Sequence, residues 1–341
     1  MSELAWLSKE LKNGKIMCEA CSQSCVLEEG QYGICGVRRV EGGELRLLVY
    51  GLAAAVNVDP VEKKPMFHFL PISRAFSLGT VGCNFSCKFC QNHDISQYPK
   101  ENNHEIIGNK LLPEQIVELA IQHKCDSIAY TYNEPIVFFE YTYDTAKIAH
   151  AKGLKNIYVT SGYETHKAID LLAPYIDGMN IDIKSFSDEF YKEICGARLK
   201  PVLEAVKYAH EKGIWVEITT LLIQGKNDSN EEIRSIARFI AELDPCIPWH
   251  LSAFHPMYKM LDVERTPEST LLRAYKIGQQ EGLKYLYIGN VDNEDYESTY
   301  CPSCKKKVID RSGNIGQFVT NKLDKNGVCP YCGYKLEGVW S

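Results

Sequence analysis

The sequence has no long apolar run, and this absence removes several classes of protein. Its start, MSELAWLSKELKNGK, has neither an extended apolar core nor a small-residue cleavage site, so it is not a secretory signal. No later segment is apolar and long enough to span a bilayer. We therefore expect a cytoplasmic protein with no membrane partner.

The chain also lacks a strong net charge. Its 341 residues carry a formal net charge of −6, with acidic and basic residues mixed along the chain. A general nucleic-acid surface needs clustered Lys and Arg, so nucleic acid is not an expected partner. Hydrophobic residues make up 45% and charged residues 24%, which is ordinary for a globular protein and argues against disorder.

What the sequence has in abundance is cysteine, with 14 residues. In a reducing cytosol, clustered cysteines are metal ligands more often than disulfides. Three cysteines stand alone and are expected to be buried structural residues. The others form an N-terminal, a central and a C-terminal group: Cys18, Cys21, Cys25 and Cys35; Cys83, Cys87 and Cys90; Cys301, Cys304, Cys329 and Cys332.

Between the outer cysteine groups, strand-like apolar runs alternate with segments of helical periodicity. This pattern predicts right-handed βαβ units and a parallel sheet, either open or curled into a barrel. Seven strands would be one short of a full eight-stranded barrel, and reactive residues should follow the carboxyl ends of the strands. The predicted strands are residues 75–81, 127–132, 156–161, 178–183, 214–223, 249–254 and 284–288.

The central cysteines lie in TVGCNFSCKFCQN, residues 80–92, directly after the first predicted strand. Three thiolates in one loop can each bind one iron of a cubane cluster and leave the fourth iron without a protein ligand. The alternative is a closed zinc site completed by His93. We favour the cluster, because structural zinc usually takes its ligands as two separated pairs.

This loop resembles the signature of the radical S-adenosylmethionine (SAM) enzymes, with Phe89 as the aromatic residue before the last cysteine. The resemblance implies a [4Fe-4S] cluster that binds SAM, splits it reductively and yields a 5'-deoxyadenosyl radical, which then takes a hydrogen atom. It also implies anaerobic chemistry and an electron donor such as flavodoxin or ferredoxin. Residues 59–71, 80–97 and 129–141 are similar to the radical enzyme of the AmmeMemoRadiSam system, a group similar to the pyruvate formate-lyase activating enzyme. The similarity covers most of residues 15–295, and Ile72 replaces that group's usual glycine.

Polar residues close the next three predicted strands. The resemblance implies that Asn133 and Glu134 bind the SAM amino group, although Asn133 could instead cap a helix that begins at Pro135. Asp182 and Lys184, two apart on a strand, point to the same face. The resemblance implies that they contact SAM and substrate, and an internal ion pair is the alternative. With these residues, the predicted cofactor-binding set is Phe89, Asn133, Glu134, Ser161, Asp182 and Lys184.

The catalytic residues are not predicted beyond the candidates Lys184, Glu217 and His255. Activases tend to carry a basic residue where Glu217 stands, which weakens a transfer of their substrate to this chain. A lone histidine such as His255 is as often a structural hydrogen-bonding group as a functional one. Lys63 and Lys64, before the first strand, could present positive charge to an anionic substrate or form a solvated turn.

The C-terminal cysteines form two Cys-x-x-Cys pairs, which predict a zinc ribbon, with a rubredoxin-like iron site as the rival. The N-terminal cysteines, spaced by three, four and ten positions, fit either zinc or an auxiliary cluster, with zinc slightly favoured. We therefore predict an N-terminal cysteine segment (1–70), a radical SAM partial (β/α) barrel (71–295) and a zinc-ribbon-like module (296–341). The expected function is hydrogen abstraction from an unidentified small molecule or protein. The alternatives are activation of a glycyl-radical enzyme, or a non-catalytic zinc-binding interaction module.

Overall fold

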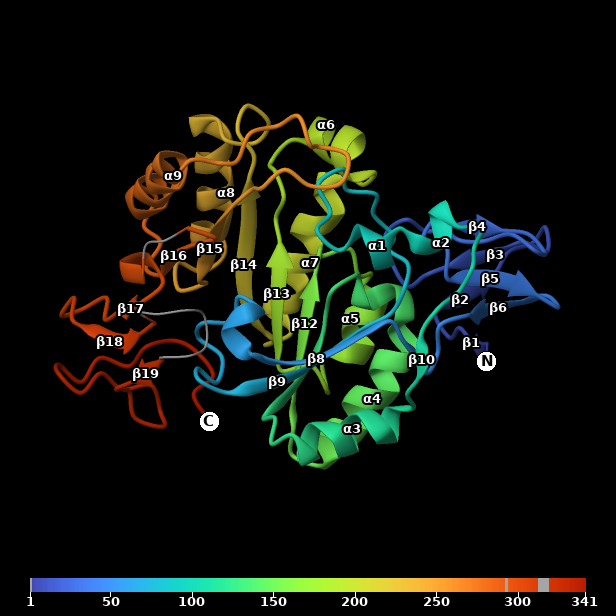
Figure 1. Cartoon of the computed structure of the whole chain (residues 1–341), viewed down its shortest axis with the longest axis horizontal. Coiled ribbons are helices and arrows are strands. Elements are labelled where there is room, and N and C mark those ends of the chain that lie inside the picture. The colour runs from blue at the N-terminus through green and yellow to red at the C-terminus, as the bar shows by residue number, and fades with distance from the viewer. Residues whose placement is uncertain (1, 292–293, 312–318) are drawn as a thin grey trace.

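The computed structural model describes residues 2–291, 294–311 and 319–341, and its centre is an eight-stranded sheet (Figure 1). The strand order is β16-β15-β14-β13-β12-β11-β9-β8, and every neighbouring pair from β9 to β16 is parallel. The predicted parallel sheet is therefore confirmed. The strands are β8 (Ala55–Pro60), β9 (Arg74–Gly79), β11 (Ser127–Tyr130), β12 (Lys155–Thr160), β13 (Gly178–Asp182), β14 (Trp215–Leu222), β15 (Trp249–Ala253) and β16 (Leu286–Gly289).

Strand β8 was not predicted, and it pairs antiparallel with β9. Its sequence, AVNVDP, alternates weakly and ends in Pro60, a residue that strands tolerate at a sheet edge. The sheet ends at β8 and β16, which do not pair with each other. The barrel is therefore partial, as predicted.

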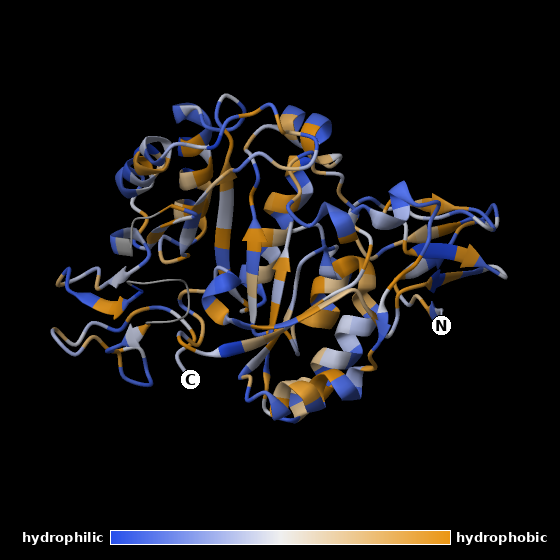
Figure 2. Cartoon of the chain, viewed as in Figure 1, coloured by the Kyte–Doolittle hydropathy of each residue, from blue (hydrophilic) through white to orange (hydrophobic). Residues whose placement is uncertain are grey.

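Strands that follow one another in sequence are neighbours in the sheet, and right-handed crossovers then place the connecting helices on one face. In α8 the apolar residues Ile233, Ile236, Ala237 and Ile240 form a buried stripe. Figure 2 shows apolar segments in both the strands of the sheet and the helices around it. The face of the sheet opposite these helices is therefore free to enclose a site. The connecting helices are α3 (Pro113–Gln122), α4 (Phe139–Ala151), α5 (His166–Leu172), α7 (Leu199–Glu211), α8 (Asn230–Leu243) and α9 (Glu268–Gln280).

The N-terminal cysteine segment forms small antiparallel sheets beside the barrel, next to α1 (His93–Ser96) and α2 (Tyr98–Glu101) (Figure 1). A buried ion pair fixes the segment to α4. The Arg38 guanidinium donates to both carboxylate oxygens of Glu140, at 3.1 and 2.6 Å, and to the carbonyl of Val137. The strands are β1 (Glu3–Leu4), β2 (Ser8–Glu10), β3 (Ile16–Cys18), β4 (Val26–Leu27), β5 (Arg38–Glu41), β6 (Glu44–Leu47) and β7 (Leu52–Ala53), the last paired with β10 (Asn109–Lys110).

The C-terminal module contains β17 (Thr299–Tyr300), β18 (Lys307–Asp310) and β19 (Thr320–Asn321). It contacts the segment that leads into β9. The Arg311 guanidinium lies 4.1 Å from the Phe67 ring centroid and donates to the Phe67 carbonyl, while the Val339 amide donates to the His68 carbonyl. The C-terminal module thus holds the segment that leads into β9, the first parallel strand of the barrel. The domain boundaries themselves stay predictions.

We expect Glu140→Ala to lower the free energy of unfolding by about 3–5 kcal/mol, because Arg38 would remain buried without its partner. Urea denaturation of the anaerobically purified protein measures this change. The control is Glu118→Ala on the exposed face of α3, which should change stability by less than about 0.5 kcal/mol. Equal effects from both substitutions would show that the ion pair does not fix the N-terminal segment.

Candidate active site

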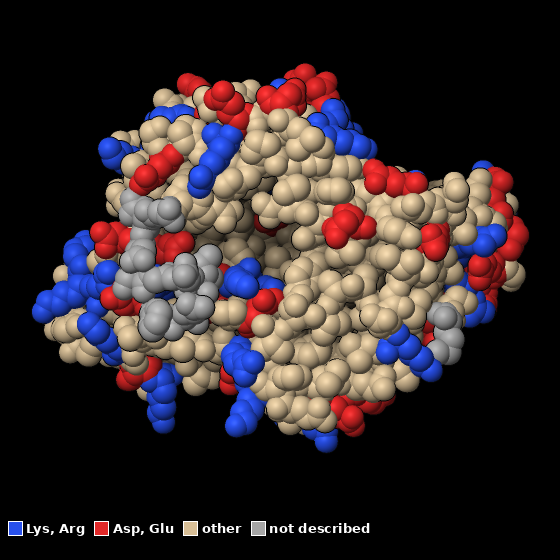
Figure 3. All heavy atoms as spheres, viewed as in Figure 1, with Lys and Arg blue, Asp and Glu red and all other residues tan. Residues whose placement is uncertain are grey.

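A cavity of about 730 Å³ lies at the carboxyl ends of the parallel strands, and it opens near the middle of the face shown in Figure 3. It is lined by the loop after β9 and by residues from β11 to β16, as the parallel-sheet rule predicts. Residues around this cavity include Cys83, Cys87, Phe89, Cys90, Asn133, Ser161, Asp182, Lys184, Thr219, His250, Ser252 and Asn290.

The three-cysteine loop is fixed at its entrance by Asn133, which follows β11. The Asn133 amide donates to the Gly82 carbonyl at 2.7 Å and to the Thr80 hydroxyl at 3.1 Å. Gly82 has φ +89°, and a Cβ there would lie 2.7 Å from the Cys35 carbonyl oxygen, so only glycine fits. Asn133 therefore positions the loop, and it is not the N-cap of the helix that begins at Pro135: that cap is Glu134.

The same loop is fixed further along by two backbone hydrogen bonds. The amides of Ser86 and Lys88 donate to the carbonyls of Cys195 and Ile194, at 2.8 and 2.9 Å. These carbonyls belong to a π-helical turn over Tyr191–Cys195, whose wide geometry is frequent at functional sites. The three thiols are thereby held around one cavity by elements from three parts of the chain.

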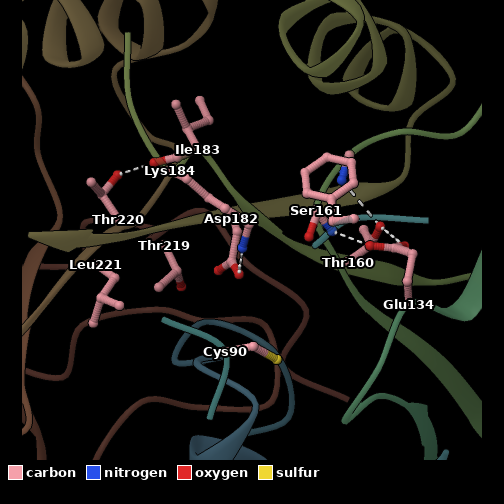
Figure 4. A network of polar contacts seen from close by, with 12 residues as sticks. Cys90, Glu134, Thr160, Ser161, Asp182, Ile183, Lys184, Thr219, Thr220 and Leu221 are labelled. Carbon is pink, nitrogen blue, oxygen red and sulfur yellow. Dashed lines mark hydrogen bonds and ion pairs between the residues drawn. The ribbon is translucent and has the colours of Figure 1, made fainter. Parts of the chain in front are cut away.

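Asp182 and Lys184 lie together at the cavity wall, at the end of β13 (Figure 4). Lys184 Nζ is 2.7 Å from Asp182 Oδ2 and 5.9 Å from the Phe89 ring centroid. Burial alone would lower the pKa of the Lys184 ammonium. The charge and hydrogen bond of Asp182, together with the nearby Cys87 and Cys195 sulfur atoms, more than offset that effect, so the pKa lies well above its ordinary value and Lys184 is charged. Asp182 is partly exposed to the cavity, so the pair offers both charges to a ligand.

Glu134 lies behind the cavity wall and bonds to the end of β12 (Figure 4). Its carboxylate accepts from the Ser161 amide at 2.9 Å and lies 2.5 Å from the Thr160 hydroxyl. Glu164 lies 2.6 Å from the same hydroxyl. One hydroxyl carries one hydrogen and cannot donate to both carboxylates, so one carboxyl must be protonated. Burial and the nearby Glu164 charge raise the pKa of Glu134 to about 8. Glu164 had no recognisable signal in the sequence.

Neither Glu217 nor His255 lines the cavity. The Glu217 carboxylate is fully buried and accepts from the amides of Phe67 and His68, at 2.9 and 2.8 Å. It also contacts His250 Nε2 at 2.7 Å. Glu217 thus holds the segment before β9, and His255 is not among the residues that line the cavity. His250, which does line it, was missed because its position inside a strand gave no signal.

Two lysines from the segment before β9 also border the cavity. Lys64 is 4% exposed and lies 2.8 Å from Asp59, whereas Lys63 is half exposed. Tyr132 closes this side, where it donates to Asp59 at 3.1 Å with a φ of +72°. Such a conformation is strained for tyrosine and is typical of functional sites. The solvated-turn alternative is wrong for Lys64 and describes Lys63 in part.

The C-terminal cysteines form a compact group. The sulfur atoms of Cys301, Cys304, Cys329 and Cys332 all lie within 4.8 Å of one another, which suits a single tetrahedral ion. Across the ranges that the structure describes, no other set of three or more His, Cys, Asp or Glu residues meets this distance. The predicted C-terminal metal module is therefore confirmed in its geometry.

A comparison with known families decides the class of the protein: the radical SAM superfamily matches residues 77–240. The chain belongs to this superfamily. An uncharacterised protein of Methanocaldococcus jannaschii is 41% identical over 98% of both chains. The pyruvate formate-lyase 1-activating enzyme of Escherichia coli K12 is 21% identical, over 60% of this chain and 89% of that enzyme. A putative glycyl-radical enzyme activating enzyme of M. jannaschii is 28% identical, over 64% and 80%.

Solved structures agree on the fold. SuiB of Streptococcus suis, bound to S-adenosylmethionine, matches with a TM-score of 0.50 and 16% identity, over 68% of this chain and 53% of that chain. The radical SAM chain is thus an enzyme whose superfamily uses a [4Fe-4S] cluster and SAM, and the non-catalytic alternative is set aside. Within the described ranges, no helix has the length and apolar character needed to cross a membrane.

We expect Glu164→Gln to flatten the pH dependence of stability. A raised native pKa means that the folded protein holds its proton more tightly than the unfolded chain, so stability falls as the pH rises from the ordinary 4.5 toward the native value of about 8. Removing the Glu164 charge lowers the pKa of Glu134 and weakens that fall, by about 1.4 kcal/mol for each pKa unit removed. Calorimetric melting between pH 5 and pH 8 measures it, with the exposed Glu242→Gln as control. If the melting temperatures of wild type and Glu164→Gln changed with pH in the same way, the Glu164 charge would not raise the pKa of Glu134.

Proposed function

We propose that this enzyme binds a [4Fe-4S] cluster at Cys83, Cys87 and Cys90 and abstracts hydrogen from an unidentified substrate in the 730 Å³ cavity. The observation that carries the proposal is the convergence of three thiols and one charged pair, Asp182 and Lys184, on that cavity. The bound cluster supplies an electron for reductive cleavage of SAM. A low-potential donor such as flavodoxin or ferredoxin would be needed.

The donor set fits this cluster. Three thiols reach one cavity, and no three of the ligand atoms there are as close as a single metal ion requires. The zinc alternative with His93 is disfavoured for the same reason. Such a cluster would have one iron without a protein ligand, and Asp182 and Lys184 at the cavity wall would complement the charged amino and carboxylate groups of SAM.

Residues of the cavity wall would orient SAM. Lys184 offers a cation and Asp182 an anion 2.7 Å away, a match for the zwitterionic end of SAM. Ser161 lies at the wall with its amide already bound by Glu134, so Glu134 supports the wall from behind. Asn133 holds the cysteine loop. The Phe89 ring lies beside the Lys184 ammonium, with 5.9 Å between Nζ and the ring centroid. None of these roles requires Glu217 or His255 to touch the substrate.

Two candidates differ in the substrate from which hydrogen is taken: a glycine of a partner protein, or an unidentified molecule. Two of the relatives described above are named activating enzymes, which supports a protein glycine as the hydrogen donor. Against it, the position expected to be basic in activases holds Glu217, which is buried under the segment before β9. We therefore place hydrogen abstraction from an unidentified substrate first. The AmmeMemoRadiSam resemblance stays a prediction.

We expect Cys87→Ala to lose SAM cleavage. The variant would retain the other two thiols of the loop but lack one ligand of the cluster. After anaerobic reconstitution with iron and sulfide, and addition of dithionite and SAM, wild type should form 5'-deoxyadenosine, and Cys87→Ala should fall to the level without enzyme. Chromatography measures the product. The control Cys125→Ala, a buried cysteine away from the cavity, should retain wild-type activity. Equal product from Cys87→Ala and wild type would refute the proposal.

We further propose that the C-terminal metal is zinc. Two sulfur pairs, Cys301 with Cys332 and Cys304 with Cys329, lie 3.6 and 3.8 Å apart, close to the edge of a tetrahedron with Zn–S bonds of about 2.3 Å. Cys329→Ser should lower zinc from about one to about zero per chain and raise hydrogen exchange in β17–β19, because such modules gain their stability from the metal. Elemental analysis and exchange measure both effects, with Cys125→Ser as control. Iron at this site in wild type would instead support the rubredoxin-like alternative.

A further inference from the structure

The four N-terminal cysteines gather around a second cavity, on the far side of the three-cysteine loop. Cys18, Cys21, Cys25 and Cys35 all line it, although they are spread over 18 positions of the chain. Ile136 and Val137 close the cavity from the barrel. A gathering of four thiols in a mostly apolar setting is a donor set for a metal centre.

The spread of these sulfur atoms argues against a single ion. No three of the four meet the 4.8 Å mutual distance that all four C-terminal cysteines meet. The cysteines of the radical SAM loop do not meet it either. A cubane carries its thiolates at the corners of a cluster and so needs them farther apart than one zinc ion does. We therefore favour a cluster over zinc at these four cysteines, in contrast to the slight preference for zinc in the sequence analysis.

A buried hydrogen-bond donor without a partner lies beside the same four cysteines. Asn84 is 1% exposed and lines the second cavity, where its side chain interacts with the Cys21 thiol, but its Nδ2 has no acceptor at ordinary hydrogen-bond distance within the described part of the chain. Leaving such a donor unpaired costs free energy, so it marks a missing acceptor. Thiolate and sulfide sulfur atoms of a cluster accept N–H bonds of this kind, and these bonds tune its potential.

The second cavity adjoins the first through the backbone around Cys83, which lines the first cavity, and Asn84, which lines the second. Asn84 follows Cys83 in sequence, and Gly82, on the other side of Cys83, packs against the Cys35 carbonyl. The Gln23 side chain donates to the carbonyls of Asn84, at 2.8 Å, and Gly196, at 3.1 Å. Both neighbours of one radical SAM cysteine thus contact the N-terminal group. Toward solvent, Cys25 is partly exposed and Ile34, which also lines the cavity, is 52% exposed.

The cavity also holds a buried positive charge. Arg38 lines it and is 2% exposed, with Glu140 and Val137 accepting three of its hydrogen bonds. A guanidinium has five N–H donors, so this one can also face an anion. A cubane with four thiolate ligands is anionic, and Arg38 would lessen the free-energy cost of burying it.

We propose that Cys18, Cys21, Cys25 and Cys35 bind a second [4Fe-4S] cluster, which accepts one electron from a low-potential protein donor and passes it to the site beside Cys83. With four protein ligands this cluster has no open iron, so it does not bind SAM. The proposal does not rest on SAM cleavage by this chain, because the metal content and the signal of the N-terminal site are measured separately.

The decisive variant replaces Cys83, Cys87 and Cys90 together by alanine. After anaerobic reconstitution, it should retain about four iron and four sulfide per chain and give a dithionite-reduced electron paramagnetic resonance signal that added SAM leaves unchanged. Zinc without iron at the N-terminal cysteines, or no metal there, would overturn the proposal.

A second measurement keeps the test valid if that variant does not fold. Wild type should hold about eight iron per chain, and SAM should change only part of its signal. The double variant Cys18→Ser and Cys35→Ser should lose about four iron and the SAM-insensitive part alone. The matched control, Cys301→Ser with Cys304→Ser, should lose zinc and keep about eight iron. Four iron in wild type, all of it sensitive to SAM, would exclude a second cluster.

Discussion

The structure depends on one constraint: three thiols must face a shared cavity without a fourth protein ligand closing the site. A short loop does not satisfy this by itself, because the positions of its thiols depend on what holds its backbone. Asn133 holds the loop entrance at Gly82, and the carbonyls of Ile194 and Cys195 hold its middle. The sheet supplies both supports, since parallel strands end at the same edge and bring loops distant in sequence together.

The charged side chains around the same cavity are arranged so that opposite charges lie close together. Two charge pairs at its wall join residues close in sequence, Lys64 with Asp59 and Lys184 with Asp182. Buried charges without partners would shift to their neutral forms. Behind the wall, Glu134 and Glu164 show the other solution, in which two carboxyl groups share a hydroxyl and one keeps its proton. The wall is therefore charged toward the ligand and neutralised toward the core.

The sequence was sufficient for the parts of the fold that local patterns determine. Apolar runs and helical periodicity predicted the seven parallel strands, and cysteine spacing predicted the site loop and the C-terminal metal group. The failures are long-range. Glu217 was a catalytic candidate, yet its partners at Phe67 and His68 lie about 150 residues away in sequence. No local pattern reports that two backbone amides need an acceptor there, and for the same reason Glu164, His250 and the edge strand β8 gave no recognisable signal.

Three cysteine groups in one chain show why ligand number alone does not identify a metal centre. The N-terminal and C-terminal groups have four thiols each, but only the C-terminal sulfur atoms lie within 4.8 Å of one another. The radical SAM loop has three thiols, and they do not meet this distance either. What separates the centres is therefore the distance between their sulfur atoms and the number of thiols that each group supplies. The two wide sites share the backbone around Cys83, so a change at Gly82 or Asn84 would alter both. The proposed transfer of an electron from the N-terminal group would run past this shared segment toward the cavity where SAM is expected to bind.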